Sequence, residues 1–189
     1  MGLGTPIPKE PAMRLLVSLA AVIIALPAAA QDMPPRKAGL WDMKMVFEGR
    51  NAPPQAMQHC IDATTDKAMQ DMSGGMQAQN CSKRETKKVG DTLVFDSVCN
   101  FGMGTTTSRG VVSGDFNSAY AVKVSSKREG GPAIPNMPAE TQMTIEAKWT
   151  GPCKADQKPG DIIMANGMKM NVSDMQKGAV PGMPGGMKK

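Results

Sequence analysis

Aromatic side chains and histidine are scarce in this sequence. The 189 residues include two Trp, one Tyr, four Phe and a single histidine, His59. Histidine-based catalysis could use only that residue, and the signature motifs of serine hydrolases, zinc proteases and phosphate-binding loops are absent. The formal net charge is +5, but acidic residues interleave with the basic ones, and no basic stripe carries stacking aromatics. We therefore expect no enzymatic activity, no cofactor and no nucleic-acid partner.

The sequence also lacks an apolar run long enough to span a membrane. Its most apolar stretch, Leu15 to Leu26, is about a dozen residues long, whereas a spanning helix needs about 20. Arg14 precedes this stretch and three alanines follow it, which is the pattern of a cleaved secretory signal. We expect a start at Met13, cleavage between Ala30 and Gln31, and an exported chain without a membrane span. Residues 1–30 would then be an N-terminal extension and signal.

Closely spaced cysteines, which zinc knuckles and thiol redox motifs require, are missing too. An even number of cysteines in an exported chain predicts disulfides instead. Gly90-Asp91 is a turn signal between two extended runs, so folding residues 81–99 about it places Cys81 opposite Cys99. A second bridge, Cys60–Cys153, follows by elimination among the four cysteines.

Alternating polar and apolar residues predict a mainly β fold with some helix. In residues 39–49, Trp41, Met43, Met45 and Phe47 alternate with polar neighbours. Further strands are expected at about 82–89, 92–99, 105–115, 119–128 and 140–150. Because Gly-containing turns separate most of them, we expect an antiparallel meander that forms a strongly curved sheet or open barrel.

One or two short helices are expected to cover the apolar face of this sheet. Residues 64–72 predict a helix that begins at Thr64 or Thr65 and ends at Ser73-Gly74-Gly75. Residues 161–175 predict a weaker helix, and residues 51–60 predict a loop. The whole arrangement is expected to be one disulfide-bonded domain over residues 31–177, followed by a disordered Gly/Pro/Met tail at 178–189.

The apolar face of the sheet has two interpretations. It could bind a lipid-like molecule, or its side chains could simply form the core. The residues concerned are Trp41, Phe47, Met143, Ile145 and Trp149.

Methionine is abundant, with 18 residues. Thioethers are soft ligands that suit Cu(I), so a weak copper-binding surface is a further hypothesis. Its candidates are Met168, Met170, Met183 and Met187. The alternative is that methionines such as Met43 and Met45 fill gaps in the core.

Several segments in a fixed order carry a family resemblance. They are AGLWDMKMVFEG (38–49), QHCIDATTDKAM (58–69), the cysteine at position 81, GDTLVFDSVC (90–99) and WTGPC (149–153). Together they resemble the DUF3617 family, exported proteins mainly of Gram-negative bacteria with no established function. The resemblance covers roughly residues 38–153 and implies a small periplasmic domain without a known catalytic set. We therefore expect a non-catalytic binding or envelope-associated module, whose partner is another envelope protein or an apolar small molecule.

Overall fold

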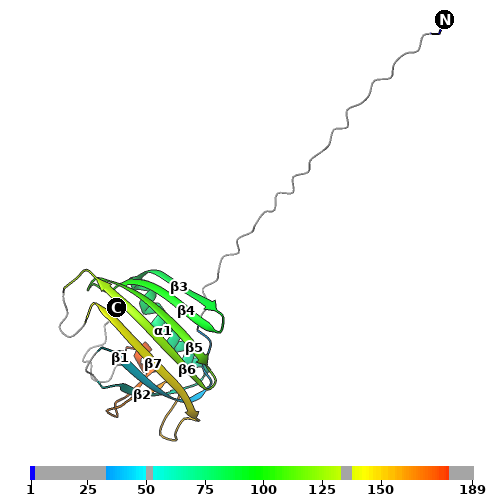
Figure 1. The fold of residues 1–189 in the computed structure, drawn as a ribbon. Coiled ribbons are helices and arrows are strands. Elements are labelled where there is room, and N and C mark those ends of the chain that lie inside the picture. The colour runs from blue at the N-terminus through cyan, green and yellow to red at the C-terminus, as the bar shows by residue number, and fades with distance from the viewer. Residues whose placement is uncertain (3–32, 50–52, 133–137, 179–189) are drawn as a thin grey trace.

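The computed structural model describes residues 1–2, 33–49, 53–132 and 138–178. Within these ranges nine strands form one sheet and two helices pack against it (Figure 1). The strands are β1 (Gly39–Glu48), β2 (Gln55–Ile61), β3 (Cys81–Val89), β4 (Thr92–Asn100), β5 (Thr105–Asp115), β6 (Ala119–Glu129), β7 (Glu140–Gly151), β8 (Asp161–Met164) and β9 (Lys169–Asn171); the helices are α1 (Ala63–Asn80) and α2 (Val172–Gln176). The expected signal from Met13 to Ala30 and almost all of the tail lie outside the described residues.

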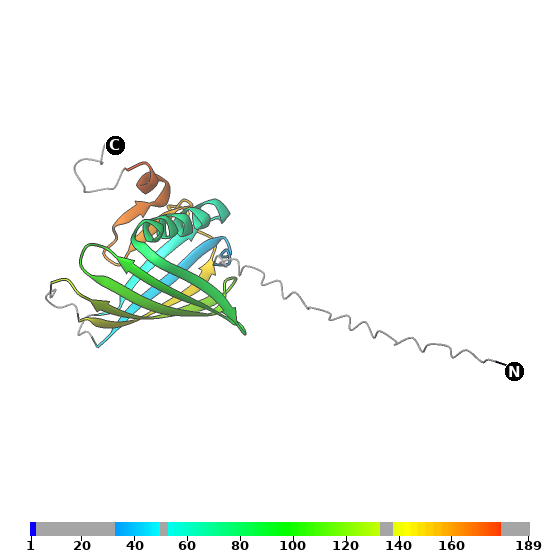
Figure 2. The same ribbon diagram turned by 90° about the horizontal axis from the view of Figure 1, so that it is seen from above.

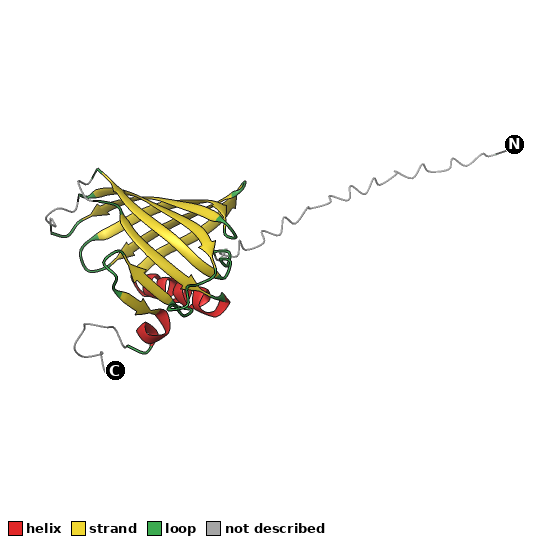
Figure 3. Cartoon of the chain, turned by 90° about the horizontal axis from the view of Figure 1, so that it is seen from below, coloured by secondary structure: helices red, strands yellow, loops and turns green. Residues whose placement is uncertain are grey.

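The strands lie in the order β3-β4-β5-β6-β7-β1-β2-β8-β9, and each neighbouring pair is antiparallel. Strands β3 to β7 form the predicted meander, and β1 then adds to β7 across a long stretch of sequence. The sheet is strongly curved without closing, and α1 lies on its concave side (Figures 2 and 3). This confirms the predicted fold class.

Register places the large apolar side chains of β1 and β7 on the concave face. Phe47 faces Met143 and Met45 faces Ile145, and directly facing residues point to the same side of a sheet. The buried cluster behind α1 draws on β1, β2, β5, β6 and β7. It consists of Trp41, Ile61, Val112, Tyr120, Val122 and Ala147. The core therefore fills one end of the concave side.

Helix α1 begins and ends elsewhere than predicted. Asp62 caps it, because Asp62 Oδ1 accepts from the Thr65 amide at 2.8 Å and Thr65 Oγ1 accepts from the Asp62 amide at 3.0 Å. The predicted stop at Ser73-Gly74-Gly75 is wrong, since the helix continues to Asn80. Tertiary contacts outweigh the glycine penalty of about 1 kcal/mol per residue. Arg84 Nη1 donates to the Gly74 carbonyl at 3.2 Å.

Two further predictions of local structure are corrected. The segment predicted as a loop at 51–60 contains most of β2, which forms because β1 and β8 pair with its two edges. Residues 161–175 do not form a single weak helix. They contain β8, β9 and most of the five-residue α2, and the side chain of Asn171 caps α2 by accepting from the Ser173 amide. The two short strands extend the sheet beyond β2.

Both predicted disulfides are present. Cys81 and Cys99 face each other at the end of the β3–β4 hairpin, with Cα atoms 3.8 Å apart. Cys60 on β2 bonds to Cys153, which follows β7, with Cα atoms 5.5 Å apart. The second bridge joins segments that flank β1 on its two sides, so it holds the end of β2 and the end of β7 together across β1.

Candidate functional site

The Gly-Leu-Trp segment anchors the chain just before β1. Gly39 has a φ of +129°, and a Cβ there would meet the Gly151 carbonyl and the Trp149 indole. Trp41 Nε1 donates to the Lys37 carbonyl at 2.8 Å, and Trp149 Nε1 donates to the Ala38 carbonyl at 3.1 Å. These two bonds hold residues 37 and 38 against the end of the sheet and set the position of the residue before them.

That residue, Arg36, enters the interior and forms a buried ion pair with α1. Its amide and its Nε donate to the two carboxylate oxygens of Asp66, at 2.8 and 2.7 Å. The side chains are 9% and 1% exposed. Gln70 Nε2 also donates to the Asp66 carboxylate, at 3.1 Å. Removing either partner of such a pair leaves an uncompensated buried charge.

The outer nitrogens of the same guanidinium face one imidazole nitrogen and two thioether sulfurs, and the Tyr120 hydroxyl is a further side-chain hydrogen-bond partner of Arg36. Arg36 Nη1 lies 3.4 Å from His59 Nδ1 on β2 and 3.8 Å from Met43 Sδ on β1. Nη2 lies 3.5 Å from Met69 Sδ on α1. We call these five residues, Arg36, Met43, His59, Asp66 and Met69, the arginine cluster. It joins the N-terminal segment, two strands and the helix.

Burial and the neighbouring Arg36 lower the pKa of His59 to about 4, while the charge of Asp66 acts in the opposite direction. His59 is therefore neutral at pH 7. Because a guanidinium can only donate, Nδ1 is the unprotonated nitrogen of this ring. Burial also raises the pKa of the nearby Tyr120 phenol, which Arg36 opposes. The cluster thus contains one cation, one anion and a neutral imidazole.

Comparison with known proteins gives one match. A family model described as "Protein of unknown function (DUF3617)" matches residues 36–153. The chain belongs to the DUF3617 family. The match begins at Arg36 and ends at Cys153, so it contains the whole arginine cluster and both disulfides. No curated protein and no solved structure matches the chain.

In this DUF3617 protein the five predicted ligand-face residues all lie on the concave face, but in different surroundings. Trp41 is completely buried and belongs to the core. Trp149 is half-buried, with the Lys37 ammonium 3.6 Å from its ring centroid. Phe47 and Met143 are half-buried at the opposite end of β1 and β7, whereas Ile145 is half-buried in the middle of β7 and packs against the core cluster. Met45 and Val124 are half-buried neighbours of the same kind, and Val124 also packs against the core. We call this set the concave patch: Met45, Phe47, Val124, Met143 and Ile145.

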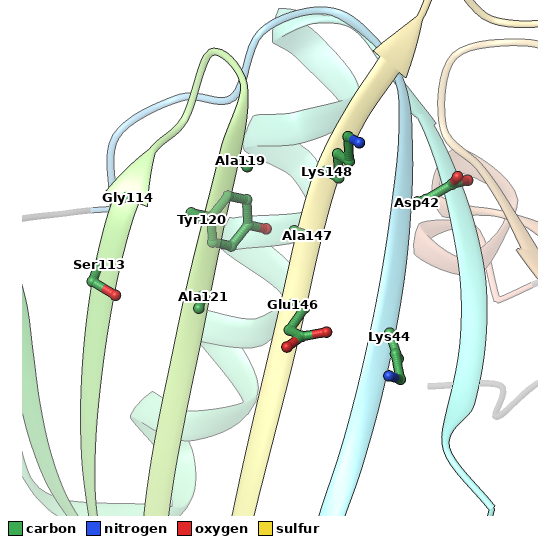
Figure 4. A pocket seen from close by; sticks show the side chains of 10 residues that line it. All are labelled: Asp42, Lys44, Ser113, Gly114, Ala119, Tyr120, Ala121, Glu146, Ala147 and Lys148. Atoms are coloured by element: carbon green, nitrogen blue, oxygen red, sulfur yellow. The ribbon is translucent and has the colours of Figure 1, made fainter.

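A shallow depression of about 540 Å³ lies on the other, convex face (Figure 4). Charged side chains of β1 and β7 line it, beside small residues of β5 and β6, and α1 lies behind the strands in this view. Asp42 faces Lys148 and Lys44 faces Glu146 across the two strands. Opposite charges therefore alternate along the depression, which gives no net preference for a ligand of either sign.

The predicted copper ligands are not gathered into a site within the described residues. Met168 is 44% exposed in the turn between β8 and β9, and Met170 is half-buried on β9. Met183 and Met187 lie outside the described ranges. In the described part of the chain no three His, Cys, Asp or Glu side chains are grouped to hold a metal. Neither described helix combines the length and hydrophobicity that a membrane crossing requires.

Sequence reasoning missed the arginine cluster. Its members are spread over residues 36 to 69 and belong to four structural segments. Two signals were available: the only histidine lies within the strand that precedes α1, and Asp66 is an acid in the first turn of that helix. Neither signal shows that Arg36 reaches both, because that contact depends on how the segment before β1 crosses the end of the sheet.

Proposed function

We propose that this protein is an exported, periplasmic, non-catalytic binding module, and that the concave patch binds a small lipid-like molecule. The observation that carries the proposal is the incomplete burial of large apolar side chains on a concave surface. Apolar concave surfaces with a few polar groups are the usual form of small-molecule sites. The two disulfides support export, because they are typical of oxidising compartments.

Exposure changes along the length of the concave face. At the end near Gly39, Trp41 and Ala147 are 0% and 3% exposed. At the other end Phe47 and Met143, which face each other, are only half-buried. Met side chains are unbranched and flexible, so such a surface adapts to apolar ligands of different shape. The patch therefore continues the core into a region that a ligand can reach.

The rim of this end is polar. Ser108 on β5 and Ser126 on β6 share a hydrogen bond of 2.8 Å, and Thr141 on β7 faces Ser126. Two exposed apolar side chains, Phe101 and Met103, lie in the loop between β4 and β5 at the same end. We infer that this loop contacts the apolar surface from which the ligand is taken.

The proposal is tested with two adjacent substitutions that differ in the face they occupy. Met143→Glu places a charge in the concave patch, whereas Gln142→Glu places it on the convex face. We expect native mass spectrometry of the protein purified from its own envelope to show a bound apolar mass. We also expect a fluorescent fatty acid to bind the wild-type protein and the Gln142→Glu variant equally, and the Met143→Glu variant at least tenfold more weakly.

Circular dichroism and thermal melts of both variants show whether each remains folded. Should Met143→Glu unfold the protein, Met143→Gln provides the milder change at the same position. The proposal is wrong if the wild-type protein carries no apolar molecule and does not bind the probe. It is equally wrong if the folded Met143 variants bind the probe as the wild-type protein does.

A further inference from the structure

The donors around the Arg36 guanidinium are those of a soft metal site. Met43 Sδ, Met69 Sδ and His59 Nδ1 lie within 3.4–3.8 Å of its two outer nitrogens. We propose that the arginine cluster binds a soft monovalent cation, Cu(I) or its analogue Ag(I), in place of this guanidinium. This site is separate from the concave patch and from the methionines near the C-terminus.

The chemistry of the three donors favours this class of ion. Thioether sulfur and imidazole nitrogen are ligands that suit Cu(I), whereas hard ions such as Mg²⁺ and Ca²⁺ require oxygen. The donors come from β1, β2 and α1, so they approach the guanidinium from different elements. A three-coordinate site of two sulfurs and one nitrogen needs no ligand from solvent.

Charge balance favours a monovalent ion over a divalent one. Asp66 is 1% exposed and carries the charge that compensates Arg36. Replacing one monocation with another leaves this buried carboxylate compensated. A divalent ion would add a net positive charge to a region where burial makes charge costly.

The site requires the donors to move closer together. Zinc binds nitrogen and sulfur at about 2.0–2.3 Å, whereas His59 Nδ1 and Met43 Sδ lie 3.4 and 3.8 Å from Nη1, and Met69 Sδ lies 3.5 Å from Nη2. Each donor must therefore approach a shared ion by more than about 1 Å. The flexible methionine side chains can supply most of this approach. Arg36 itself precedes β1 and follows exposed residues 33–35. Its withdrawal breaks no strand pairing, and the two indole bonds still hold residues 37 and 38. It does break the Nε–Asp66 ion pair, so the bound ion must take over the compensation of that buried carboxylate.

The single histidine makes the test site-specific. We expect Ag(I), added to the purified protein, to shift the ring resonances of His59 in a ¹H–¹⁵N NMR titration that saturates at one equivalent. In parallel, Cu(I) buffered by a chromophoric chelator under ascorbate should transfer to the protein. Zn²⁺ at the same concentration should leave the His59 resonances unchanged.

Variants separate this site from the other methionines. Met43→Leu/Met69→Leu conserves volume and should weaken Cu(I) binding at least tenfold. Met168→Leu/Met170→Leu, the matched control at the sheet edge, should not change it. Arg36→Gln removes the competing cation and should strengthen binding at least tenfold. Ag(I) should also raise the melting temperature of this variant more than that of the wild-type protein.

Three results would overturn the proposal: an unmoved His59 signal in the wild-type protein, equal affinity in the Met43/Met69 variant, or an equal loss in the Met168/Met170 control. Unchanged or weaker binding by folded Arg36→Gln would also contradict it. If that variant does not fold, the wild-type titration and the two leucine variants decide the question alone.

Discussion

At the scale of single residues, the buried ion pair is the contact whose loss should be most costly. Asp66→Asn leaves the Arg36 guanidinium buried without its anion, and breaking such a pair costs about 3–5 kcal/mol. Asp71→Asn is the matched control on the same helix, because its ion pair with Lys67 is 2.9 Å long but exposed. Exposed pairs of this spacing contribute about 0.3–0.5 kcal/mol. Urea unfolding of the two variants at pH 7 measures both values.

A comparable loss of stability in the two variants, or no loss in either, would contradict the assigned role of Asp66. It would mean that the Arg36 guanidinium finds other compensation, or leaves the interior when its partner is neutral. In that case the hydrogen bond from Gln70 would stabilise the Asp66 carboxylate more than the ion pair with Arg36 does.

His59 gives the metal-free protein a defined pH dependence. Its pKa is lowered from 6.5 to about 4 on folding, so the unfolded chain binds the proton more tightly. The contribution of neutral His59 to the free energy of unfolding is therefore fully present above pH 6.5. It is lost as the pH falls from 6.5 to 4, and this group causes no further loss below pH 4. The total loss is on the order of 3 kcal/mol.

His59→Asn keeps an acceptor near Arg36 but cannot be protonated. We expect the free energy of unfolding of the wild-type protein, relative to this variant, to fall between pH 6.5 and 4 in urea titrations. Taking the difference between the two proteins removes the contribution of carboxylates such as Asp62 and Asp115, whose lowered pKa values affect both equally. A constant difference over this range would show that His59 is not buried as the structure places it.

At the scale of secondary-structure elements, glycine has opposite roles in α1 and in the sheet. A Cβ at Gly75 would have no heavy atom within 4 Å, so Gly75→Ala should stabilise the protein by about 0.5–1 kcal/mol. Gly110 on β5 lies under the Phe95 ring, which a Cβ would strike. Gly110→Ala should therefore destabilise it by about 1–3 kcal/mol. Thermal unfolding of the two variants tests both signs. A destabilising Gly75→Ala would contradict the continuous helix.

The sequence predicted those elements whose local pattern agrees with their final surroundings. Alternation revealed β1, β6 and β7, each of which has one apolar face, and turn residues such as Gly90-Asp91 indicated the remaining strands of the meander. It failed for β2, where Gln55, Gln58 and His59 interrupt the pattern. That strand is stabilised by pairing on both edges and by burial of Cys60 and Ile61. It failed again at the end of α1, where contacts from β3 maintain a helix that Gly74-Gly75 would end in isolation.

The concave patch and the arginine cluster differ in the same way. Strand alternation predicted three of the five patch residues, Phe47, Met143 and Ile145. Which side chains of this face are fully buried could not be predicted, because that depends on where α1 lies. The cluster depends on the path of a short non-regular segment. No periodicity indicates that Arg36, His59 and Met69 meet.

At the scale of the whole molecule, β1 determines how the two parts of the sheet are joined. It pairs with β7 on one side and with β2 on the other, and these pairings link residues about a hundred positions apart as well as close neighbours. Long-range strand pairing requires the closure of a long loop, which is entropically costly. The Cys60–Cys153 bridge closes such a long loop, beside the pairing of β1 with β7.

The two disulfides should therefore differ in their effect on stability. Cys60–Cys153 spans 93 residues and Cys81–Cys99 spans 18. In the chain-entropy model the longer loop stabilises the folded state by about 1.5 kcal/mol more than the shorter one. Cys60→Ala/Cys153→Ala should thus lower the free energy of unfolding more than Cys81→Ala/Cys99→Ala. Guanidinium unfolding of the two double variants gives the comparison.

Native-state hydrogen exchange shows which strands lose stability in each variant. For the long bridge we expect protection to fall first in β1, β2 and β8, whereas for the short one it should fall in β3 and β4. Equal destabilisation with exchange confined to β3 and β4 in both variants would mean that the core about Trp41, rather than the bridge, holds β1 in the sheet.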